Sequence, residues 1–592
     1  MTAGRTSARL SVRRILAALE RLAMVSVVVA AGIVALHRLG SGPCTALPSG
    51  GSPVTIWMRL GLCGSDVCGA NEAIEAIFVQ QMVEHGEVAF PLANGIQPMY
   101  KPPLFHWSAF ALDRLTGVRK VTAFNLRAAA AIYALLGIAL TIGFAESRFE
   151  GETAIVAGLI LVSSYQYMNL ARVGRVDMTL CFFETLALLA FLRWLDPVRP
   201  PVPTAAMPAR RSRVAHYLLA LALGLGVLAK GPVGAILPLA AIALFLVLDR
   251  RSAETRELLR PGPVALALTV GLSWYAMCLA GRRYGFLSRQ LGAENFGRFF
   301  GTLGIMPPWY YLKPLLFNSL PASLMVPIAV FWALRLKRVT APGDGVVGAA
   351  PDASESASTA PDGAASFAKP SAQQRNTVRL LALFWVATVL FFSIAAYKRR
   401  AYLLPLWPAS ALLIAAWLEA QKARFGGRML RGTFAFACAL AIIFNFFYLP
   451  WRESHDCGLD SFRPAAAQLR SVLGPDDRLY AYGFRNSLAP LVFYLDHNVT
   501  RLHGRLDVVP DGYLLMPVHL WQTHRGEEPD LRPVMRVPWR GEGLVLLRSI
   551  PAYAGRLPRR AASRLPEIKP GPYAARPAAL SVPTSAVRSA SP

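Results

Sequence analysis

The stretch RRSRVAHYLLALALGLGVLAKGPVGAILPLAAIALFLVLDRR, residues 210–251, decides the fold. It contains two apolar runs, 214–230 and 232–249, and each is long enough to cross the hydrocarbon core of a bilayer. Arginines precede the first run and follow the second, whereas Lys230 lies where the two runs meet. Because Lys and Arg collect in cytoplasmic loops, the stretch predicts a membrane hairpin whose turn faces outward.

Apolar runs of similar length recur through the first three quarters of the 592-residue chain. Hydrophobic residues make up 54% of the chain and charged residues only 16%, which is too little charge to cover a soluble domain of this size. We therefore predict a polytopic α-helical membrane protein of about eleven spans, at 20–39, 122–145, 152–168, 178–195, 214–230, 232–249, 263–280, 311–334, 378–396, 401–420 and 432–449. The first run lacks a small-residue cleavage site, which favours a retained anchor over a signal peptide.

The formal net charge of +27 would suit a nucleic-acid-binding protein, but the placement of the charge argues against that class. The basic residues lie mostly in short clusters between apolar runs. With a cytoplasmic N-terminus, alternating spans place the following clusters on the inner side: Arg5, Arg9, Arg13 and Arg14; Arg210, Arg211 and Arg213; Arg250, Arg251, Arg256 and Arg260; Arg335, Lys337 and Arg338; Lys422, Arg424, Arg428 and Arg431. The same alternation places the region after the last span outside.

The chain divides by composition into a membrane domain and a C-terminal domain. We predict a cytoplasmic N-terminus at 1–19, a transmembrane domain at 20–449, a periplasmic domain at 450–554 and a disordered tail at 555–592. Residues 340–376, rich in Ala, Ser, Pro, Gly and Asp, are typical of a disordered cytoplasmic linker. The C-terminal domain is predicted to be a small α/β fold, with strands at RLYAYG, LVFYLD and GLVLLRS and a helix at PAAAQLRSVLG that ends at Gly474.

The first outer loop, at about 40–121, is long for a connection, which is typical of a functional segment. Within it, ANEAIEAIFVQQMVEHG spaces its apolar residues as in an amphipathic helix that could lie flat in the membrane interface. Glu72 and Glu75 share another face of this helix, and they either carry chemistry or only stabilise its first turn. Cys63 and Cys68 in the same loop could form a disulfide outside the cytoplasm, although Cys44 or Cys457 could compete.

Basic residues follow in two short outer segments. In PMYKPPLFHW, Pro102 favours an extended conformation for Lys101, whose ammonium either binds a phosphate at the membrane surface or snorkels. In NLARVGRVDM, Arg172, Arg175 and Asp177 crowd the end of an apolar helix, where charge is costly unless it is paired or used. A salt bridge between Arg175 and Asp177 is the modest alternative.

Further polar residues predicted on the outer side are Lys230, Glu294, Asn295, Arg298 and Lys398. Five loops thus direct basic groups toward one side of the bilayer, against the tendency of positive charge to stay inside. This arrangement predicts an anionic ligand at the outer membrane surface.

In these segments the chain resembles the polyprenyl-phosphate-dependent GT-C glycosyltransferases, the group that includes aminoarabinose transferases and protein mannosyltransferases. The resemblance rests on NEA…M…HG…P…KPPLFHW, GRVDM, GLGVLAKGPVG, ENFGRF…PPWYY and FFSIAAYKRRAYLLPLWP, in this order across about residues 70–410. The resemblance depends on the order and spacing of these motifs and on their predicted location on the same side of the membrane. It implies a bacterial inner-membrane protein that transfers a sugar from a polyprenyl phosphate to a lipid A, glycan or protein acceptor on the periplasmic side.

By this resemblance, Lys101 matches the lysine that contacts the donor phosphate, and Asp177 matches the acid of the second loop. Members often begin the first-loop helix with Asp-Glu, but here Asn71 stands in the Asp position and cannot accept a proton. We therefore expect Glu72 to be the catalytic base, with Asp177 next and Asp66 as a substitute from the loop between the cysteines.

The resemblance also implies roles for the remaining polar residues. Donor-phosphate binding is expected from Lys101, Arg172, Arg175, Lys230, Arg298 and Lys398. Substrate positioning is expected from Asn71, Glu75, Tyr100, His106, Glu294, Asn295 and Tyr402. Tyr100 stands where the aminoarabinose transferases have a glutamate thought to bind metal, so no cofactor is firmly predicted and a divalent metal remains an alternative.

Two other functions share some of these features. A lipid-linked-sugar transporter or polysaccharide assembly factor without transferase activity would have the same spans, but it would tend to place ionisable residues inside them and to show repeated halves. An inactive relative that serves as a binding module is favoured by Asn71. The acids in the outer loops favour the enzyme, whose expected partners are the lipid-linked sugar, its acceptor and membrane lipids, and not nucleic acid.

Overall fold

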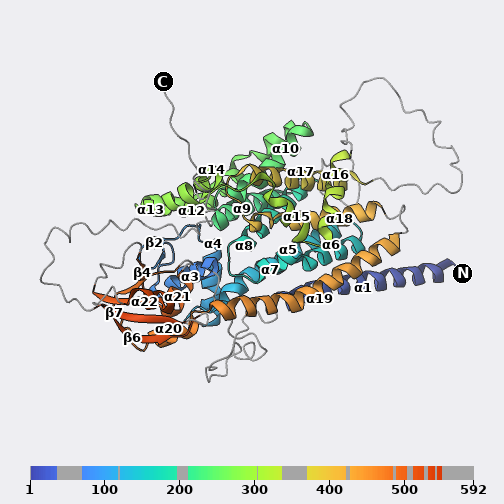
Figure 1. Ribbon diagram of the computed structural model, residues 1–592. Helices are drawn as coiled ribbons and strands as arrows, with labels where there is room; N and C mark the ends of the chain where they lie inside the picture. The colour runs from blue at the N-terminus through green and yellow to red at the C-terminus, as the bar shows by residue number, and fades with distance from the viewer. Residues whose placement is uncertain are drawn as a thin grey trace, which may run out of the picture.

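The computed structural model describes residues 2–36, 70–117, 120–196, 211–302, 304–336, 370–421, 427–484, 488–502, 511–525, 531–539 and 543–549. Its helices form an elongated body, and a small α/β domain packs at the end of this body opposite the N-terminus (Figure 1). The predicted polytopic α-helical membrane fold is confirmed. The proposed disulfide cysteines Cys63 and Cys68 and the tail at 555–592 lie outside the described residues.

Seven helices within the described residues are long and apolar enough to cross a membrane: α1 (Thr2–Leu36), α5 (Ala123–Arg148), α8 (Asp177–Leu195), α9 (Arg213–Lys230), α12 (Pro261–Ala280), α17 (Ala372–Ile394) and α19 (Gly427–Asp460). The pair α6 (Gly151–Ser163) and α7 (Tyr165–Ala171), bent by 68°, forms an eighth if it is one span. Shorter apolar helices are α10 (Val233–Leu248), α16 (Val326–Arg335) and α18 (Leu406–Ala420). These helices agree in position with the predicted spans, and the number of eleven stays a prediction.

Two predicted spans are broken rather than continuous. The region 311–334 forms η3 (Pro308–Tyr311), α15 (Leu312–Phe317), η4 (Ala322–Leu324) and α16. Its prolines remove amide hydrogens and interrupt a single helix. The span predicted over 152–168 breaks at Ser164, where Nδ2 of Asn445 on α19 donates to the free carbonyl of Ser163 at 3.0 Å. In addition, α17 begins at Ala372, inside the linker predicted over 340–376.

The hairpin of α9 and α10 depends on close contact between two glycines. A Cβ atom on Gly234 would lie 2.2 Å from the carbonyl oxygen of Gly226, and one on Gly226 would lie 2.8 Å from the oxygen of Gly234. Gly231, at φ +93°, makes the turn between the helices in a backbone region that glycine adopts without strain. Lys230 is thereby held at the corner of a tightly packed pair.

The C-terminal domain contains a five-stranded sheet in the order β4-β3-β5-β7-β6. Its elements are α20 (Arg463–Leu469), β3 (Leu479–Ala481), α21 (Ala489–Leu495), β4 (Val499–Arg501), β5 (Gly512–Pro517), α22 (Val518–His524), β6 (Leu531–Val537) and β7 (Leu544–Ser549). Strands β4, β3 and β5 are parallel, with Leu479 opposite both Val499 and Tyr513. Strands β5, β7 and β6 are antiparallel, and their inward residues, such as Leu515 and Leu546, form the core.

Three predictions for this region need correction. LVFYLD lies largely in helix α21 and is not a strand, because a short apolar run that is buried on all sides has no period that distinguishes helix from strand. The helix predicted to end at Gly474 stops as α20 at Leu469. The domain boundary at 450 is also wrong, since α19 continues without a break to Asp460.

Helix α3 (Ala70–His85) lies between the helical body and the α/β domain. Its residues from Glu72 to Gln80 are buried, so the predicted amphipathic helix is enclosed by protein and does not lie flat in the interface. Gln80 donates from Nε2 to Oδ1 of Asp496 at 2.8 Å. In the turn between β1 (Leu92–Ala93) and β2 (Gln97–Pro98), Asn94 exchanges two hydrogen bonds with the backbone of Val499, at 2.7 and 2.8 Å.

The glycine contact of the hairpin gives a test of the fold. We expect Gly234→Ala to lower the stability by about 1–3 kcal/mol, because the added methyl group forces α9 and α10 apart. Gly143 on α5 is the control, since a Cβ atom there meets no atom within 4 Å. Thermal unfolding in detergent measures both variants. A Gly234→Ala protein as stable as Gly143→Ala would contradict this packing.

Candidate functional site

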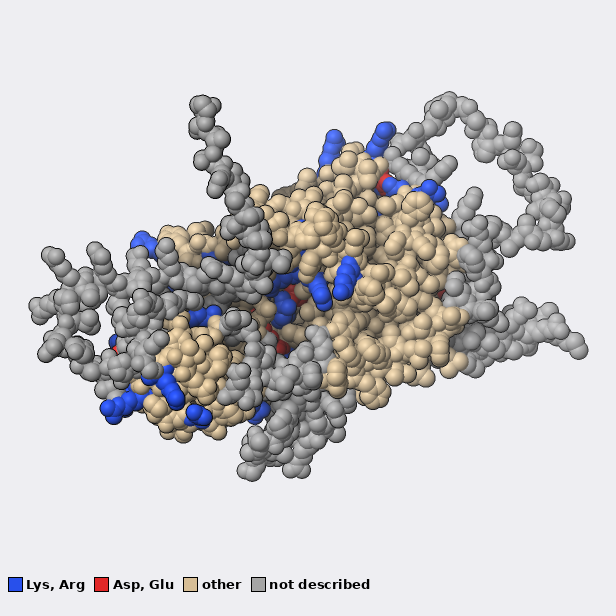
Figure 2. Space-filling view, viewed as in Figure 1, with Lys and Arg blue, Asp and Glu red and all other residues tan. Residues whose placement is uncertain are grey.

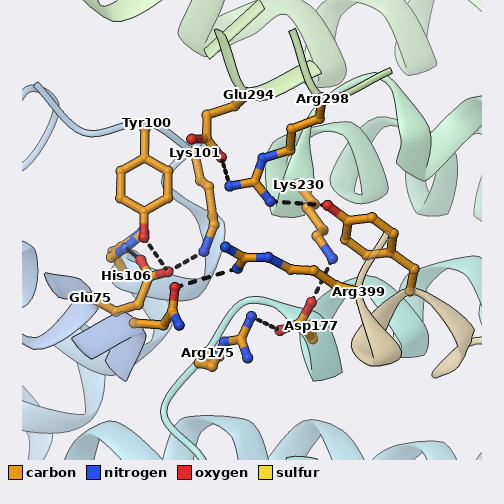
Figure 3. A network of polar contacts seen from close by, with 12 residues as sticks. Glu75, Tyr100, Lys101, His106, Arg175, Asp177, Lys230, Glu294, Arg298 and Arg399 are labelled. Carbon is orange, nitrogen blue, oxygen red and sulfur yellow. Dashed lines mark hydrogen bonds and ion pairs between the residues drawn. The ribbon is translucent and has the colours of Figure 1, made fainter. Parts of the chain in front are cut away.

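Charged side chains gather in a recess between the helical body and the α/β domain (Figure 2). They come from α3, the segment before α4 (Leu104–Thr116), the start of α8, the end of α9, the π-helix η2 (Ser288–Gly297) with α14 (Arg298–Phe300), and the segment around η6 (Arg400–Leu403). Most of the residues that the sequence predicts on the outer side converge here (Figure 3).

Glu75 is the centre of the first group of contacts. Its carboxylate is fully buried and pairs with Nζ of Lys101 through Oε1. Nε2 of His106 donates to Oε2 at 2.7 Å, and the hydroxyl of Tyr100 donates to Oε1 at 3.4 Å. Burial alone would raise the pKa of Glu75, but the charge of Lys101 and the hydrogen bond from His106 outweigh it and lower the pKa to about 2. Glu75 is therefore an ionised carboxylate that Lys101, His106 and Tyr100 hold in place.

Asp177 is the centre of the second group. It is the first residue of α8 and is 2% exposed, so its charge also faces the positive end of the helix dipole. Oδ1 accepts from Nζ of Lys230 at 2.5 Å, and Oδ2 lies 3.0 Å from a guanidinium nitrogen of Arg175. The predicted Arg175–Asp177 pair is present, and Lys230 joins it from another helix.

The third group lies across the recess on η2 and α14. Glu294 accepts from Arg298 at 2.5 Å, and Arg298 also donates to the hydroxyl of Tyr402 at 3.0 Å. The Tyr402 ring lies 5.0 Å below Nζ of Lys230, which links this group to Asp177. Asn295 donates instead to the backbone oxygen of Gln290 at 2.6 Å, and it thus stabilises the π-helix.

Arg399 is a site residue that the sequence analysis did not select. Its side chain crosses the centre of the site in Figure 3, between the Glu75 and Asp177 groups. It donates to Oδ1 of Asn71 at 3.4 Å and to the hydroxyl of Tyr397 at 3.3 Å. The three consecutive cations in YKRRAYLLP were the available signal, but sequence alone could not tell which of them faces the site.

Lys398, the cation selected from that motif, points elsewhere. It is 2% exposed and donates to the backbone oxygens of Ala395 and Met306 at 2.6 and 3.2 Å. Arg172 is likewise fully buried and donates to the backbone oxygens of Val34 and Ala35, in the last turn of α1, at 2.8 and 3.3 Å. Both residues satisfy backbone carbonyls, so the structure gives no support to their predicted role in phosphate binding.

Glu72, the first candidate for the base, is committed to Arg127. The two side chains form a two-pronged salt bridge at 2.7 and 2.8 Å, and the backbone amide of Gly174 adds a hydrogen bond at 2.8 Å. A charged residue within an apolar span usually has a partner of opposite charge. The position of Arg127 in such a span therefore indicated, in the sequence, that a carboxylate pairs with it. Asp66 lies outside the described residues.

Gln166 connects the segment that carries Arg399 and Tyr402 to the bend between α6 and α7. Nε2 of Gln166 donates to the backbone oxygen of Arg400 at 2.5 Å, and Oε1 accepts from Asn318 at 2.9 Å and from Trp407 at 3.1 Å. The side chain is 4% exposed. Gln166 lies on α7, which leads directly to the loop before Asp177. It therefore holds the segment of Arg399 and Tyr402 in place relative to Asp177.

The arrangement favours an anion. Five cations face three carboxylates in the site: Lys101, Arg175, Lys230, Arg298 and Arg399 against Glu75, Asp177 and Glu294. The described residues contain no group of three His, Cys, Asp or Glu side chains that could hold a metal ion. Positive charge that exceeds the local negative charge, beside apolar helices, suits the phosphate of a lipid.

The comparison with protein families agrees with this chemistry. Residues 100–276 match the family described as dolichyl-phosphate-mannose-protein mannosyltransferase. An uncharacterised protein of Aquifex aeolicus is 27% identical over 379 residues, which cover 62% of this chain and 63% of the relative. The undecaprenyl phosphate-α-4-amino-4-deoxy-L-arabinose arabinosyl transferase of Pectobacterium atrosepticum is 24% identical, over 66% of this chain and 64% of the relative. The match thus spans less than two thirds of the length of these curated relatives.

The structural comparison extends over more of the chain. ArnT from Cupriavidus metallidurans, in a crystal structure bound to undecaprenyl phosphate, superposes with a TM-score of 0.65 and 18% identity, over 90% of this chain and 98% of that one. The apo structure of the same protein gives a TM-score of 0.64. The fold is therefore that of the superposed ArnT structures, and the family match over residues 100–276 agrees with the resemblance predicted from the motifs.

The Glu75 cluster predicts a specific response to acid. The folded pKa of about 2 lies below the ordinary value of 4.5, so the unfolded state binds the proton first and stability falls as the pH drops from about 4.5 toward 2. Glu75→Gln should lack this part of the acid response. It should also cost about 3–5 kcal/mol at neutral pH, because Lys101 and His106 lose their ionised partner. Thermal unfolding against pH measures both effects.

Glu87→Gln provides the matched control, since Glu87 is exposed on the same loop. It should keep the acid response and the neutral stability of the parent chain. A Glu75→Gln protein that is indistinguishable from Glu87→Gln would show that the cluster does not stabilise the fold.

Proposed function

We propose that this chain is a membrane glycosyltransferase that transfers a sugar from a polyprenyl-phosphate donor to an acceptor on the outer side of the membrane. The observation that carries the proposal is the convergence of Lys101, Arg175, Lys230, Arg298 and Arg399 in one recess at the ends of the apolar helices. The names of the relatives and of the superposed structure refer to undecaprenyl phosphate, which is an anion of this class on a membrane lipid.

The proposed reaction is a single displacement at the anomeric carbon. The acceptor oxygen or nitrogen forms a bond to this carbon while the bond to the phosphate oxygen breaks, and the electron pair leaves with the lipid phosphate. The fixed cations offset the charge that develops on this leaving group, and they need no reorganisation because Glu75, Asp177 and Glu294 hold them in place.

Asp177 takes the place that the sequence analysis gave to Glu72. Both carboxylates are paired with cations, but the partner of Glu72 is Arg127 on α5, whereas the partners of Asp177 are Lys230 and Arg175, which are among the cations that would hold the phosphate. In the proposed reaction the carboxylate of Asp177 orients the acceptor and takes its proton where the acceptor carries one. An acceptor that is already ionised needs only the orientation.

The location follows from the same topology. The proposal places the protein in a bacterial inner membrane with the site on the periplasmic face, because the basic clusters between the apolar runs favour the opposite face as cytoplasmic. The acceptor is a lipid A, glycan or protein group, and the sugar is a hexosyl or pentosyl unit. Assays with both donor types distinguish the two.

Loss of the site residues should abolish transfer. We expect Asp177→Asn and Lys101→Ala each to lower the transfer rate by about 100-fold or more, because one removes the acceptor carboxylate and the other a phosphate cation. The measurement is transfer of labelled sugar from a polyprenyl-phosphate donor by the protein in lipid nanodiscs. Asp476→Asn and Lys313→Ala change exposed residues outside the site and should leave the rate unchanged. Full activity of both site variants would refute the assignment.

Glu72→Gln separates a structural role from a catalytic one. Because Arg127 then loses its ionised partner inside a span, we expect stability to fall by about 3–5 kcal/mol. Transfer per folded molecule should stay within about tenfold of the parent rate. The double variant Glu72→Leu with Arg127→Met should recover stability, because it leaves no unpaired charge. Complete loss of transfer in a fully folded Glu72→Gln protein would instead restore Glu72 as the base.

A further inference from the structure

Arg399 differs from the other four cations of the site in its partners. Lys101 pairs with Glu75, Arg298 pairs with Glu294, and Arg175 and Lys230 share Asp177. Among the described residues, Arg399 has contacts with neutral groups only. These are the amide oxygen of Asn71, and the hydroxyl and ring of Tyr397, with the ring centre 5.5 Å from the guanidinium.

Asn71 is the side chain that decides this difference. It lies in the first turn of α3 and is exposed, and its Oδ1 is 3.4 Å from NH1 of Arg399. The two nearby carboxylates of α3 cannot replace it, because Glu72 is bound to Arg127 and Glu75 to Lys101. A carboxylate at position 71 would have the same shape as the amide and would add one negative charge directly opposite Arg399.

We propose that the neutral side chain of Asn71 leaves the charge of Arg399 available, and that Arg399 binds the phosphate of the donor lipid. This inference rests on the proposed function and adds a specificity-determining pair to it. A guanidinium held by long hydrogen bonds to an amide and a phenol can exchange them for charge-assisted bonds to phosphate oxygens, which are shorter and about twice as strong. A guanidinium already paired with a carboxylate would lose an ion pair in the same exchange.

The position of Asn71 in the first turn of α3 allows an effect on phosphate binding to be distinguished from an effect on folding. An aspartate in the first turn of a helix is favoured by the helix dipole, so Asn71→Asp should fold as well as the parent chain or better. The variant is therefore expected to keep its stability while it binds phosphate less well. A residue with a purely structural role would not show this combination.

The experiment measures the affinity of the full chain in nanodiscs for undecaprenyl phosphate. Asn71→Asp should weaken binding about tenfold or more, whereas Asn71→Ala, which removes only the long hydrogen bond, should change it by about twofold at most. Arg399→Gln should weaken binding by a similar factor to Asn71→Asp. The double variant should bind no more weakly than Arg399→Gln alone, because the added carboxylate then has no guanidinium to neutralise.

Gln81→Glu is the control for charge, because it also replaces an amide by a carboxylate of the same shape on α3. Gln81 is half-buried and lies ten residues from Asn71. It should leave binding unchanged. Unchanged or tighter binding by Asn71→Asp would overturn the inference, and so would additive effects of the two single variants. If the parent chain binds the lipid and transfers sugar while Asn71→Asp behaves normally, the inference alone fails. If the parent chain does neither, the proposed function fails with it.

Discussion

The cost of an unpaired charge beside hydrocarbon is the constraint on which the whole site depends. Glu72 meets this constraint by its two-pronged bond to Arg127 on α5, and this bond holds the start of α3 against the apolar helices. Glu75, one turn later, does the same through Lys101 and His106. The Glu72–Arg127 pair thereby ties the first outer loop to the helical body, and the Glu75 contacts tie α3 to the later part of the same loop. Breaking either set by removing one partner leaves a buried charge.

The same constraint shapes the electrostatics of the recess. Each carboxylate in the recess pairs with at least one cation and holds it in place, so the cations stay close together despite their mutual repulsion. Since Asp177 holds two of them, and Arg399 contacts only amide and phenol groups within the described part of the chain, positive charge remains in excess in the recess. Preorganised charge of this kind is what a departing phosphate requires.

The sequence predicted the helical class and most of the spans, because a bilayer demands long apolar runs and cytoplasmic basic clusters. It could not predict the bend at Ser164, which is stabilised by Asn445 from a helix far away in the chain. For a similar reason it could not predict that Lys398 donates to the backbone carbonyls of Ala395 and Met306 while its neighbour Arg399 contacts Asn71. Motif order located the site, and long-range contacts decided which side chains enter it.

The α/β domain supports the site although none of the residues labelled in Figure 3 comes from it. Asp496 and Val499 bind Gln80 and Asn94, so the domain encloses the side of α3 that the helical body leaves uncovered. A helix lying in the membrane interface could rotate and carry its carboxylates away from their partners. A helix packed between two bodies cannot, and the alignment of Glu75 with the cations of the other loops follows from that enclosure.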